Sequence, residues 1–349
     1  DMTAASIYAV SLMNTMPGNY WSDDGIAKPE TSAVIESLDR VLEAEPDHPL
    51  ALHLYIHALE ASNDPGRAEA AADRLANLVP GAGHLVHMPS HIYYRVGRYN
   101  DAALANQRAA DVDEAYIAAC NAQGFYPALY YPHNIHFLWS AATMQGQSAL
   151  SIESARRVVA NVRVEQVQAF PTVEFFRTVP LLSLVRFGRW DDILREPHPH
   201  EGFIFAKSVW HYARGVAYAA KGEGDLAKGE LDALVPLQDD VSVRFLDSRD
   251  YPGSLLVGIA TELLRGEIAY RSGSYLQAIT HFSAAVEQQD SLPYTEPPFW
   301  YYPTRQSLGA AMMASGDAQG AEAVFRRDLE LYPHNGWSMF GLMQSLRAQ

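Results

Sequence analysis

Cysteine is almost absent from this sequence of 349 residues, which contains Cys120 alone. A single thiol excludes a disulfide within the chain and any zinc or iron–sulfur site built from several cysteines. Basic residues are also scarce, because 26 lysines and arginines stand against 41 aspartates and glutamates and leave a net charge of −15 at pH 7. Such a chain repels the phosphate backbone of nucleic acids, so we expect no nucleic-acid partner.

Long apolar runs are missing as well. No run approaches the roughly 18 residues that cross a bilayer, so we expect a soluble protein of the cytoplasm or the periplasm without a membrane partner. The phosphate-binding loop, the dinucleotide fingerprint and the G-x-S-x-G elbow are absent too, which removes support for NTP hydrolysis, hydride transfer and serine hydrolysis. The sequence enters an amphipathic pattern directly after Asp1, and from this we expect further residues upstream.

No segment shows the alternation of apolar and polar residues that is typical of a strand. Amphipathic stretches of roughly 12 to 20 residues instead alternate with short breaks that contain Gly, Asp, Asn or Pro. Pro46 and Pro80 each follow a helical stretch, and they are separated by about 34 residues, a period typical of helical repeats. The sequence therefore predicts an all-α fold with an internal repeat.

Near the C-terminus, SLGAAMMASGDAQGAEAVFRRDLELYP places Leu308, Gly309, Ala321, Phe325 and Pro333 at the offsets of the tetratricopeptide repeat, or TPR. Similar turn sequences occur as RVGRYNDA, RFGRWDD, AKGEGDLA and RSGSYLQA. The chain thus resembles TPR proteins over nearly its whole length, although beyond residue 97 the spacings stretch to roughly 40–50 residues. The resemblance implies a right-handed α-solenoid of stacked antiparallel helix pairs, formed as a single domain over residues 1–349.

Histidines recur with the period of this repeat. His87 follows His53, and His91 follows His57, by the same repeat length that separates the two prolines, so an H-x-x-x-H pair occurs on two consecutive first helices. The resemblance implies that these positions face the concave groove of the solenoid. A third first helix adds two histidines three residues apart, and we expect Pro89 in the first turn of its helix. Residues 49–146 are therefore the His-rich part, and residues 147–349 hold further repeats.

Two histidines one turn apart on a helix can share a metal ion, and imidazole suits zinc, copper and iron. We predict a site for one or two transition-metal ions, with copper favoured because the ligand set contains no carboxylate, and with zinc and iron left open. The predicted ligands are His53, His57, His87, His91, His133 and His136. The predicted supporting or substrate-groove residues are His84, Glu60, Asp113, Tyr131, Glu174, Arg177 and His211.

Several interpretations of this pattern stay open. Each histidine could be a hydrogen-bonded core residue, which is the ordinary role of a buried imidazole. A metal-dependent oxidoreductase or a zinc hydrolase would use the groove for a small or peptide-like substrate. A TPR scaffold would use it for a peptide, a protein partner or a second copy of the chain, and any metal would then be structural.

Overall fold

The computed structural model describes residues 1–22, 25–122, 124 and 126–349. These residues form two compact units, of which unit 1 comprises Asp1–Ala141 with Tyr294–Glu296, and unit 2 comprises Ala142–Pro293 with Pro297–Gln349. Within the described ranges the β structure is limited to an isolated bridge between Trp21 and Ala27. The predicted all-α class is confirmed, whereas the single domain over the whole length stays a prediction.

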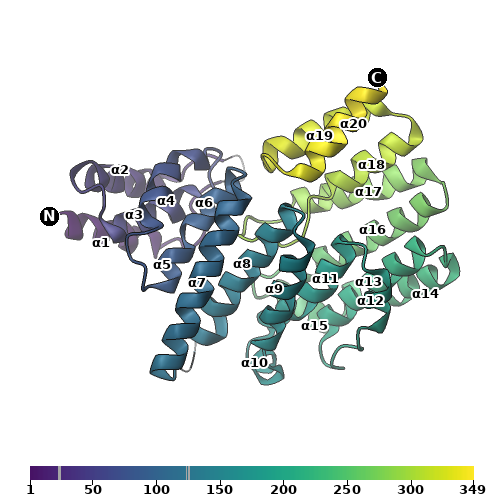
Figure 1. Ribbon diagram of the computed structural model, residues 1–349, viewed down its shortest axis with the longest axis horizontal. Helices are drawn as coiled ribbons and strands as arrows, with labels where there is room; N and C mark the ends of the chain where they lie inside the picture. Colours follow the sequence, from purple (N-terminus) through teal and green to yellow (C-terminus); the bar gives the residue numbers. More distant parts are fainter. Residues whose placement is uncertain (23–24, 123, 125) are drawn as a thin grey trace. The chain divides into compact units, whose positions relative to one another are not determined.

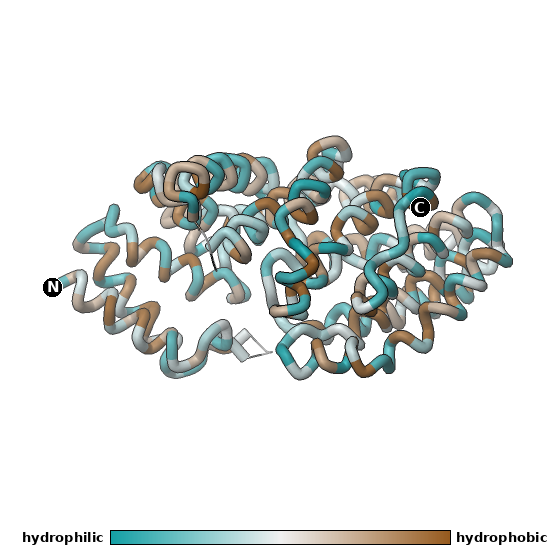
Figure 2. Tube along the Cα trace, turned by 90° about the horizontal axis from the view of Figure 1, so that it is seen from below, coloured by the Kyte–Doolittle hydropathy of each residue, from teal (hydrophilic) through white to brown (hydrophobic). Residues whose placement is uncertain are grey.

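Unit 1 consists of helices joined by short turns. Its elements are α1 (Met2–Met13), α2 (Pro29–Ala44), α3 (Pro49–Leu59), η1 (Pro65–Ala68), α4 (Glu69–Leu75), α5 (Gly83–His87), α6 (Pro89–Arg95), α7 (Tyr99–Cys120), the π-helical turn η2 (Tyr126–Tyr130) and α8 (Tyr131–Met144), whose last three residues count to unit 2. Apolar and polar residues alternate along these helices in Figure 2, as expected of helices that bury one face.

The helix that carries most of the histidines is interrupted by a proline. Pro89 has no N–H to donate, so the helical hydrogen bonds break between α5 and α6. Met88 nevertheless keeps helical dihedral angles, with φ −49° and ψ −40°, and the chain continues in the same direction. His87 and His91 consequently stay on one face, one turn apart. Pro89 is the first residue of α6, which confirms its expected position.

Unit 2 contains the remaining helices. They are α9 (Ser148–Ala160), α10 (Val164–Ala169), η3 (Pro171–Thr178), α11 (Val179–Arg186), α12 (Trp190–Arg195), α13 (Ile204–Ala220), α14 (Gly224–Leu234), η4 (Val235–Asp239), α15 (Val241–Asp247), α16 (Gly253–Arg271), α17 (Tyr275–Asp290), α18 (Arg305–Ser315), α19 (Ala318–Leu331) and α20 (Gly336–Ala348). From α16 to α20, each helix packs against the next one along the chain (Figure 1).

The helix pairs of unit 2 pack through a glycine and an aromatic ring. A Cβ atom on Gly309 of α18 would collide with the ring of Phe325 on α19, and one on Gly266 of α16 would collide with Phe282 on α17. The ring follows the glycine at the same separation in both pairs, which is the separation present in the TPR pattern of this segment. The missing side chain lets the two helices approach closely. The resemblance to TPR helix pairs is therefore confirmed at the level of the fold.

A turn glycine separates the two helices of each such pair. Gly273 and Gly316 have φ of +79° and +92°, in the left-handed region that residues with a Cβ rarely adopt. Gly97 of unit 1 has φ of +80° and occupies the same place between α6 and α7. In the part of the chain that the structure describes, no helix is both long and apolar enough to cross a membrane.

Candidate metal centre

Six histidines of unit 1 gather in two groups of three. We call His53, His57 and His84 the outer triad, and His87, His91 and His133 the inner triad. In each triad the three residues offer one ring nitrogen each, and these nitrogens all lie within 4.8 Å of one another. The triads adjoin, because the ring centroids of His57 and His91 are 5.5 Å apart.

The outer triad comes from α3 and α5. Nε2 of His53 lies 3.3 Å from Nε2 of His84, and the pair on α3 is kept on one face by the four-residue spacing of its members. Nδ1 of His57 lies 2.9 Å from Oε1 of Glu60, which follows directly after α3. All three histidines of this triad are half-buried.

The inner triad comes from α5, α6 and α8. Nε2 of His87 lies 2.9 Å from Nε2 of His91. Nδ2 of Asn106 donates to the backbone oxygen of Ala102 at 2.8 Å, so the amide oxygen of Asn106 points to His87 and accepts from its Nδ1–H at 2.6 Å. His87 thus carries its proton on Nδ1, and the lone pair of Nε2 faces into the triad.

Two carboxylates surround the far nitrogen of His91. Nδ1 of His91 contacts Glu60, and it lies 3.1 Å from Oε2 of Glu296. Glu60 therefore contacts one histidine of each triad, whereas Glu296 reaches the inner triad from the segment Tyr294–Glu296. Metal-bound histidines in proteins usually donate their second N–H to a carboxylate or a carbonyl, and this arrangement supplies such acceptors.

Burial sets the protonation of most of these imidazoles. Burial, together with the charges of neighbouring histidines, lowers the pKa of His53 to about 3 and that of His84 to about 4. Burial also holds the pKa values of His87 and His133 well below their ordinary value. These four side chains are neutral at physiological pH, which is the form that binds metal.

His91 behaves differently from its neighbours. Burial disfavours its charged form, but the charges of Glu60 and Glu296 outweigh burial and raise its pKa to about 10. Burial likewise opposes the ionisation of Glu60, yet His91 and His57 hold the pKa of this carboxyl well below its usual range. Without a metal ion, the centre therefore contains an ion pair between His91 and Glu60.

The nitrogen–nitrogen distances fit shared metal ions. With metal–nitrogen bonds of about 2.0–2.1 Å, two ligands of a tetrahedral ion lie about 3.3 Å apart and two ligands at a right angle lie about 2.9 Å apart. The measured distances are 3.3 Å from His53 to His84 and 2.9 Å from His87 to His91. The three nitrogens of each triad lie within 4.8 Å of one another, so small movements of the rings would bring all three onto one ion.

The two triads follow one rule of construction. Each takes an H-x-x-x-H pair from one helix and a single histidine from the first helix of the next repeat. The single histidines are His84 and His133, and His84 precedes Gly97 at the same separation at which His133 precedes Gly146, the turn glycine of its own repeat. Five of the six predicted ligands are brought together in this way, and His84 is the sixth member of the two groups.

His136 lies outside both triads. It is buried, and its ring stacks on Trp139 with the centroids 5.0 Å apart. The separation from His136 to Gly146 equals the separation from His87 to Gly97. His136 therefore corresponds to His87, the first residue of its histidine pair. In α8 the second position of such a pair holds Ser140 instead of histidine.

Asp113 supports the centre from one layer further out. Its buried carboxylate accepts from the hydroxyl of Tyr126 at 2.6 Å and from Nδ2 of Asn134 at 2.7 Å. A Cβ atom on Gly83 would collide with this carboxylate, so the absence of a side chain there allows α5 and α7 to meet. Asp113 thereby fixes Asn134, the residue next to His133. The nearby Tyr131 is buried, and its hydroxyl donates to Glu114.

Three of the predicted supporting residues lie in unit 2. Glu174 accepts the backbone N–H of Ala206 at 2.8 Å, and burial raises its pKa to about 7. Arg177 donates to the backbone oxygen of Val162 at 2.7 Å. His211 contacts Glu230 at 2.7 Å. Each of the three has a packing or ion-pair role within unit 2.

Sequence reasoning missed Asn106 and Glu296. In the repeats of unit 2, an aromatic residue follows a glycine at a fixed separation, and Asn106 follows Ser90 at that same separation. A polar residue at the position of the aromatic ring was therefore a detectable signal. Glu296 carried no such signal, because it stands in the Pro-rich segment EPPFWYY, far along the chain from every histidine that it approaches.

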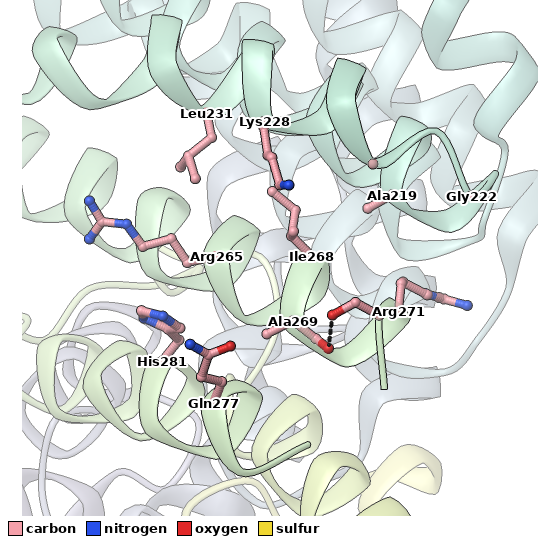
Figure 3. Close-up of a pocket in the computed structure, with 12 residues that line it drawn as sticks. Ala219, Gly222, Lys228, Leu231, Arg265, Ile268, Ala269, Arg271, Gln277 and His281 are labelled. Carbon is pink, nitrogen blue, oxygen red and sulfur yellow. Dashed lines mark hydrogen bonds between the residues drawn. The ribbon is translucent and has the colours of Figure 1, made fainter. Parts of the chain in front are cut away.

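Unit 2 contains a cavity of about 480 Å³ whose lining includes Lys228, Arg265, Arg271 and His281 (Figure 3). Arg265 and His281 both contact Glu262, at 2.5 and 2.7 Å, so both side chains already have a partner within the protein. In Figure 3 the guanidinium groups of Arg265 and Arg271 extend to opposite sides of the cavity. The cations therefore do not converge on one ligand, unlike the imidazoles of unit 1.

No protein-family model matches this sequence, and no curated protein matches it either. Among solved structures, the Naa15/Naa10 complex bound to HypK-THB matches with a TM-score of 0.35 and 13% identity, over 98% of this chain and 44% of that chain. The P58(IPK) TPR domain matches with a TM-score of 0.25 and 10% identity, over 100% of this chain and 98% of that one. Yeast Tom70 matches with a TM-score of 0.22 and 11% identity, over 98% and 96%. Scores this low support no inference about this chain, so its function is argued from its own residues.

Proposed function

We propose that this protein binds two transition-metal ions, one in each histidine triad. The observation that carries the proposal is the repetition of a three-histidine group, with polar partners already placed on the far nitrogens of His57, His87 and His91. Asn106 orients His87, and Glu60 contacts both His57 and His91. An ordinary core histidine needs one hydrogen-bond partner. Where the proton is held on the far nitrogen, as in His87, the nitrogen that faces into the triad offers a lone pair to a metal ion.

The ligand chemistry narrows the choice of ion. Imidazole nitrogens without thiolates select copper, zinc or iron over the metals that prefer sulfur. Copper is favoured because the carboxylates contact the Nδ1 atoms of histidines, which leaves the triads themselves with nitrogen donors only. Bound in such triads, copper or iron would supply redox chemistry with oxygen, and zinc would supply an activated water.

Metal analysis of the whole chain tests the proposal. Protein treated with a chelator, then given Cu²⁺ or Zn²⁺ and desalted, is expected to retain about two ions per chain by mass spectrometry. His57→Ala should reduce this number. His198→Ala is the matched control, because His198 is exposed in a loop of unit 2, and it should retain the wild-type number.

The proposal fails if wild-type protein retains neither copper nor zinc nor iron(II) after loading. It also fails if His198→Ala loses as much metal as His57→Ala, because binding would then be spread over surface imidazoles. Loading with iron(II) is carried out without oxygen, so that precipitation of oxidised iron is not counted as binding.

A second function, as a scaffold for a protein partner, is favoured by the C-terminal helix. The helix α20 exposes Met339, Phe340 and Leu346, whose exposed fractions are 52%, 60% and 49%. Exposed apolar side chains on one helix are typical of a surface that another chain covers. A second copy is the occupant that can be tested directly. The molar mass by light scattering should then rise with concentration, and Phe340→Asp should abolish the rise.

A further inference from the structure

We infer that the two triads differ in role: the outer triad holds an exchangeable ion that also takes a small ligand from solution, and the inner triad holds a slowly exchanging ion. This inference rests on the proposed function and assigns a site of ligand binding within it. The ligand is a small molecule or anion that donates through nitrogen or oxygen, since those donors fill an open position on an imidazole-bound ion.

Exposure falls steadily from the outer triad to the inner one. The side chain of His57 is 28% exposed, that of Glu60 13%, that of His91 8% and that of Glu296 2%. His87 is completely buried. Three protein ligands leave at least one position open on a tetrahedral ion. All three histidines of the outer triad are half-buried, whereas in the inner triad His133 alone is half-buried and the other two are buried. Solvent and small ligands therefore reach the open position of the outer triad more readily.

The supports of the two triads differ as well. In the inner triad, Asn106 fixes His87, and His91 lies between two carboxylates. In the outer triad, Glu60 contacts His57. The buried Nδ1 atoms of His84 and His91 both lack a hydrogen bond among the described residues, but only His91 has carboxylates within ion-pair distance there. Partners on the far nitrogen fix the ring and strengthen metal binding by about 10–100-fold. The inner ion is therefore expected to bind more tightly and to leave more slowly.

An aromatic side chain borders the outer triad. The ring of Tyr130 stands edge-on to His84, with centroids 5.2 Å apart, and Tyr126 stacks on Tyr130 at 5.4 Å. The ligand position of the outer ion thus has tyrosines on the side of His84. Glu60, which also contacts this triad, already contacts both His57 and His91.

Chelator kinetics and azide binding test the inference on the whole chain. Protein loaded with two equivalents of Cu²⁺ is mixed with EDTA, and the copper absorbance is followed with time. We expect two phases of equal amplitude that differ in rate by about tenfold or more. Azide added before the chelator should give a charge-transfer band that disappears with the fast phase.

Variants assign the phases to the triads. His53→Ala should remove the fast phase and the azide band and should keep the slow phase. Glu296→Gln should accelerate the slow phase and leave the fast phase unchanged, because Glu296 approaches the inner triad only. Far-ultraviolet circular dichroism checks that each variant is folded. If a variant does not fold, the presence or absence of two phases in the wild type tests the inference.

The outcomes separate this inference from the proposed function. If the chain retains no copper, iron or zinc, the proposed function fails. If it retains two copper ions that leave in one phase, or if azide binds in His53→Ala as in wild type, the proposed function stands and the unequal roles are wrong. If Glu296→Gln accelerates the fast phase alone, the assignment of the triads is reversed and the inference is overturned.

Discussion

The helix pair α6–α7 of unit 1 and the last helix pairs of unit 2 share one packing position but hold different residues there. In unit 2 this position holds Gly266 with Phe282, and Gly309 with Phe325. In unit 1 it holds Ser90 with Asn106, at the same separation along the chain. Where unit 2 buries an aromatic ring between two helices, unit 1 buries an amide that fixes an imidazole. One helix-pair geometry thus serves packing in one region and the orientation of an imidazole in the other.

The comparison also explains why the amide is tolerated. A buried polar group destabilises a fold by about 1–3 kcal/mol when it is left without a partner. Asn106 is fully buried, but it donates to Ala102 and accepts from His87. Its polar groups have partners. Compared with unit 2, unit 1 therefore buries less apolar area at this position, but it acquires no unpaired polar group.

The largest effect is expected from a substitution at the packing position of unit 2, where an aromatic ring lies against a glycine. Phe325→Ala removes a ring that is 4% exposed and packs against Gly309, so the free energy of unfolding should fall by about 3–5 kcal/mol. Urea denaturation followed by circular dichroism measures this loss. Copper retained per folded chain should not change. A loss of copper in the folded variant would show that the two regions are not independent in this respect.

A second test concerns the buried carboxyl of unit 2. Burial raises the pKa of Glu174 from 4.5 to about 7, so the folded protein binds this proton more tightly than the unfolded chain does. The stabilisation is present below pH 4.5 and is lost as the pH rises through 7, by a total on the order of 3 kcal/mol. Glu174→Gln cannot ionise and should lack this loss. Urea denaturation of both proteins at pH 5 and pH 8 measures it, and a difference between them that does not vary with pH would contradict the pKa shift.

A substitution at the corresponding position of unit 1, which holds Asn106, should change the affinity for metal. Asn106→Leu keeps a similar volume but removes the acceptor for Nδ1 of His87, so the affinity for the inner ion should fall by about 10–100-fold. Competition with a chromophoric chelator measures the affinity of each ion. Ser90→Ala is the milder control, because its hydroxyl lies 3.3 Å from the same nitrogen. Equal affinities in Asn106→Leu and wild type would show that the amide has only a packing role.

The smallest effect is expected at His136. Its ring stacks on Trp139 and belongs to neither triad, so His136→Ala should retain the wild-type number of copper ions. His133→Ala, three residues earlier on the same helix, should lose the inner ion. Mass spectrometry of the two variants side by side makes the comparison. Loss of an ion in both variants would favour the ligand set predicted from sequence, which contains both histidines.

This difference shows what the sequence could predict. The repeat-length spacing of the histidine pairs correctly brought His53 and His57 near His87 and His91, because consecutive repeats stack in register. The pairing of His133 with His136 by their three-residue spacing was less informative than their distances from the turn glycine. Counted from that turn, His133 corresponds to His84 and completes a triad, whereas His136 lacks a second histidine one turn later.

Glu296 was beyond prediction. Its approach to the inner triad depends on how the segment Tyr294–Glu296 folds back onto unit 1, and neither the repeat period nor the helix pattern specifies that path.

If each triad binds an ion as proposed, the shared carboxylate of Glu60 would make the two ions thermodynamically dependent on each other. One of its oxygens lies near His57 and the other near His91, so an ion that withdraws electron density from either imidazole strengthens that ring's hold on Glu60. The interaction of Glu60 with the other of these two imidazoles would then weaken. Each proposed ion would therefore alter the affinity for the other by the same factor, and a carboxylate outside both triads would set the sign and size of their cooperativity.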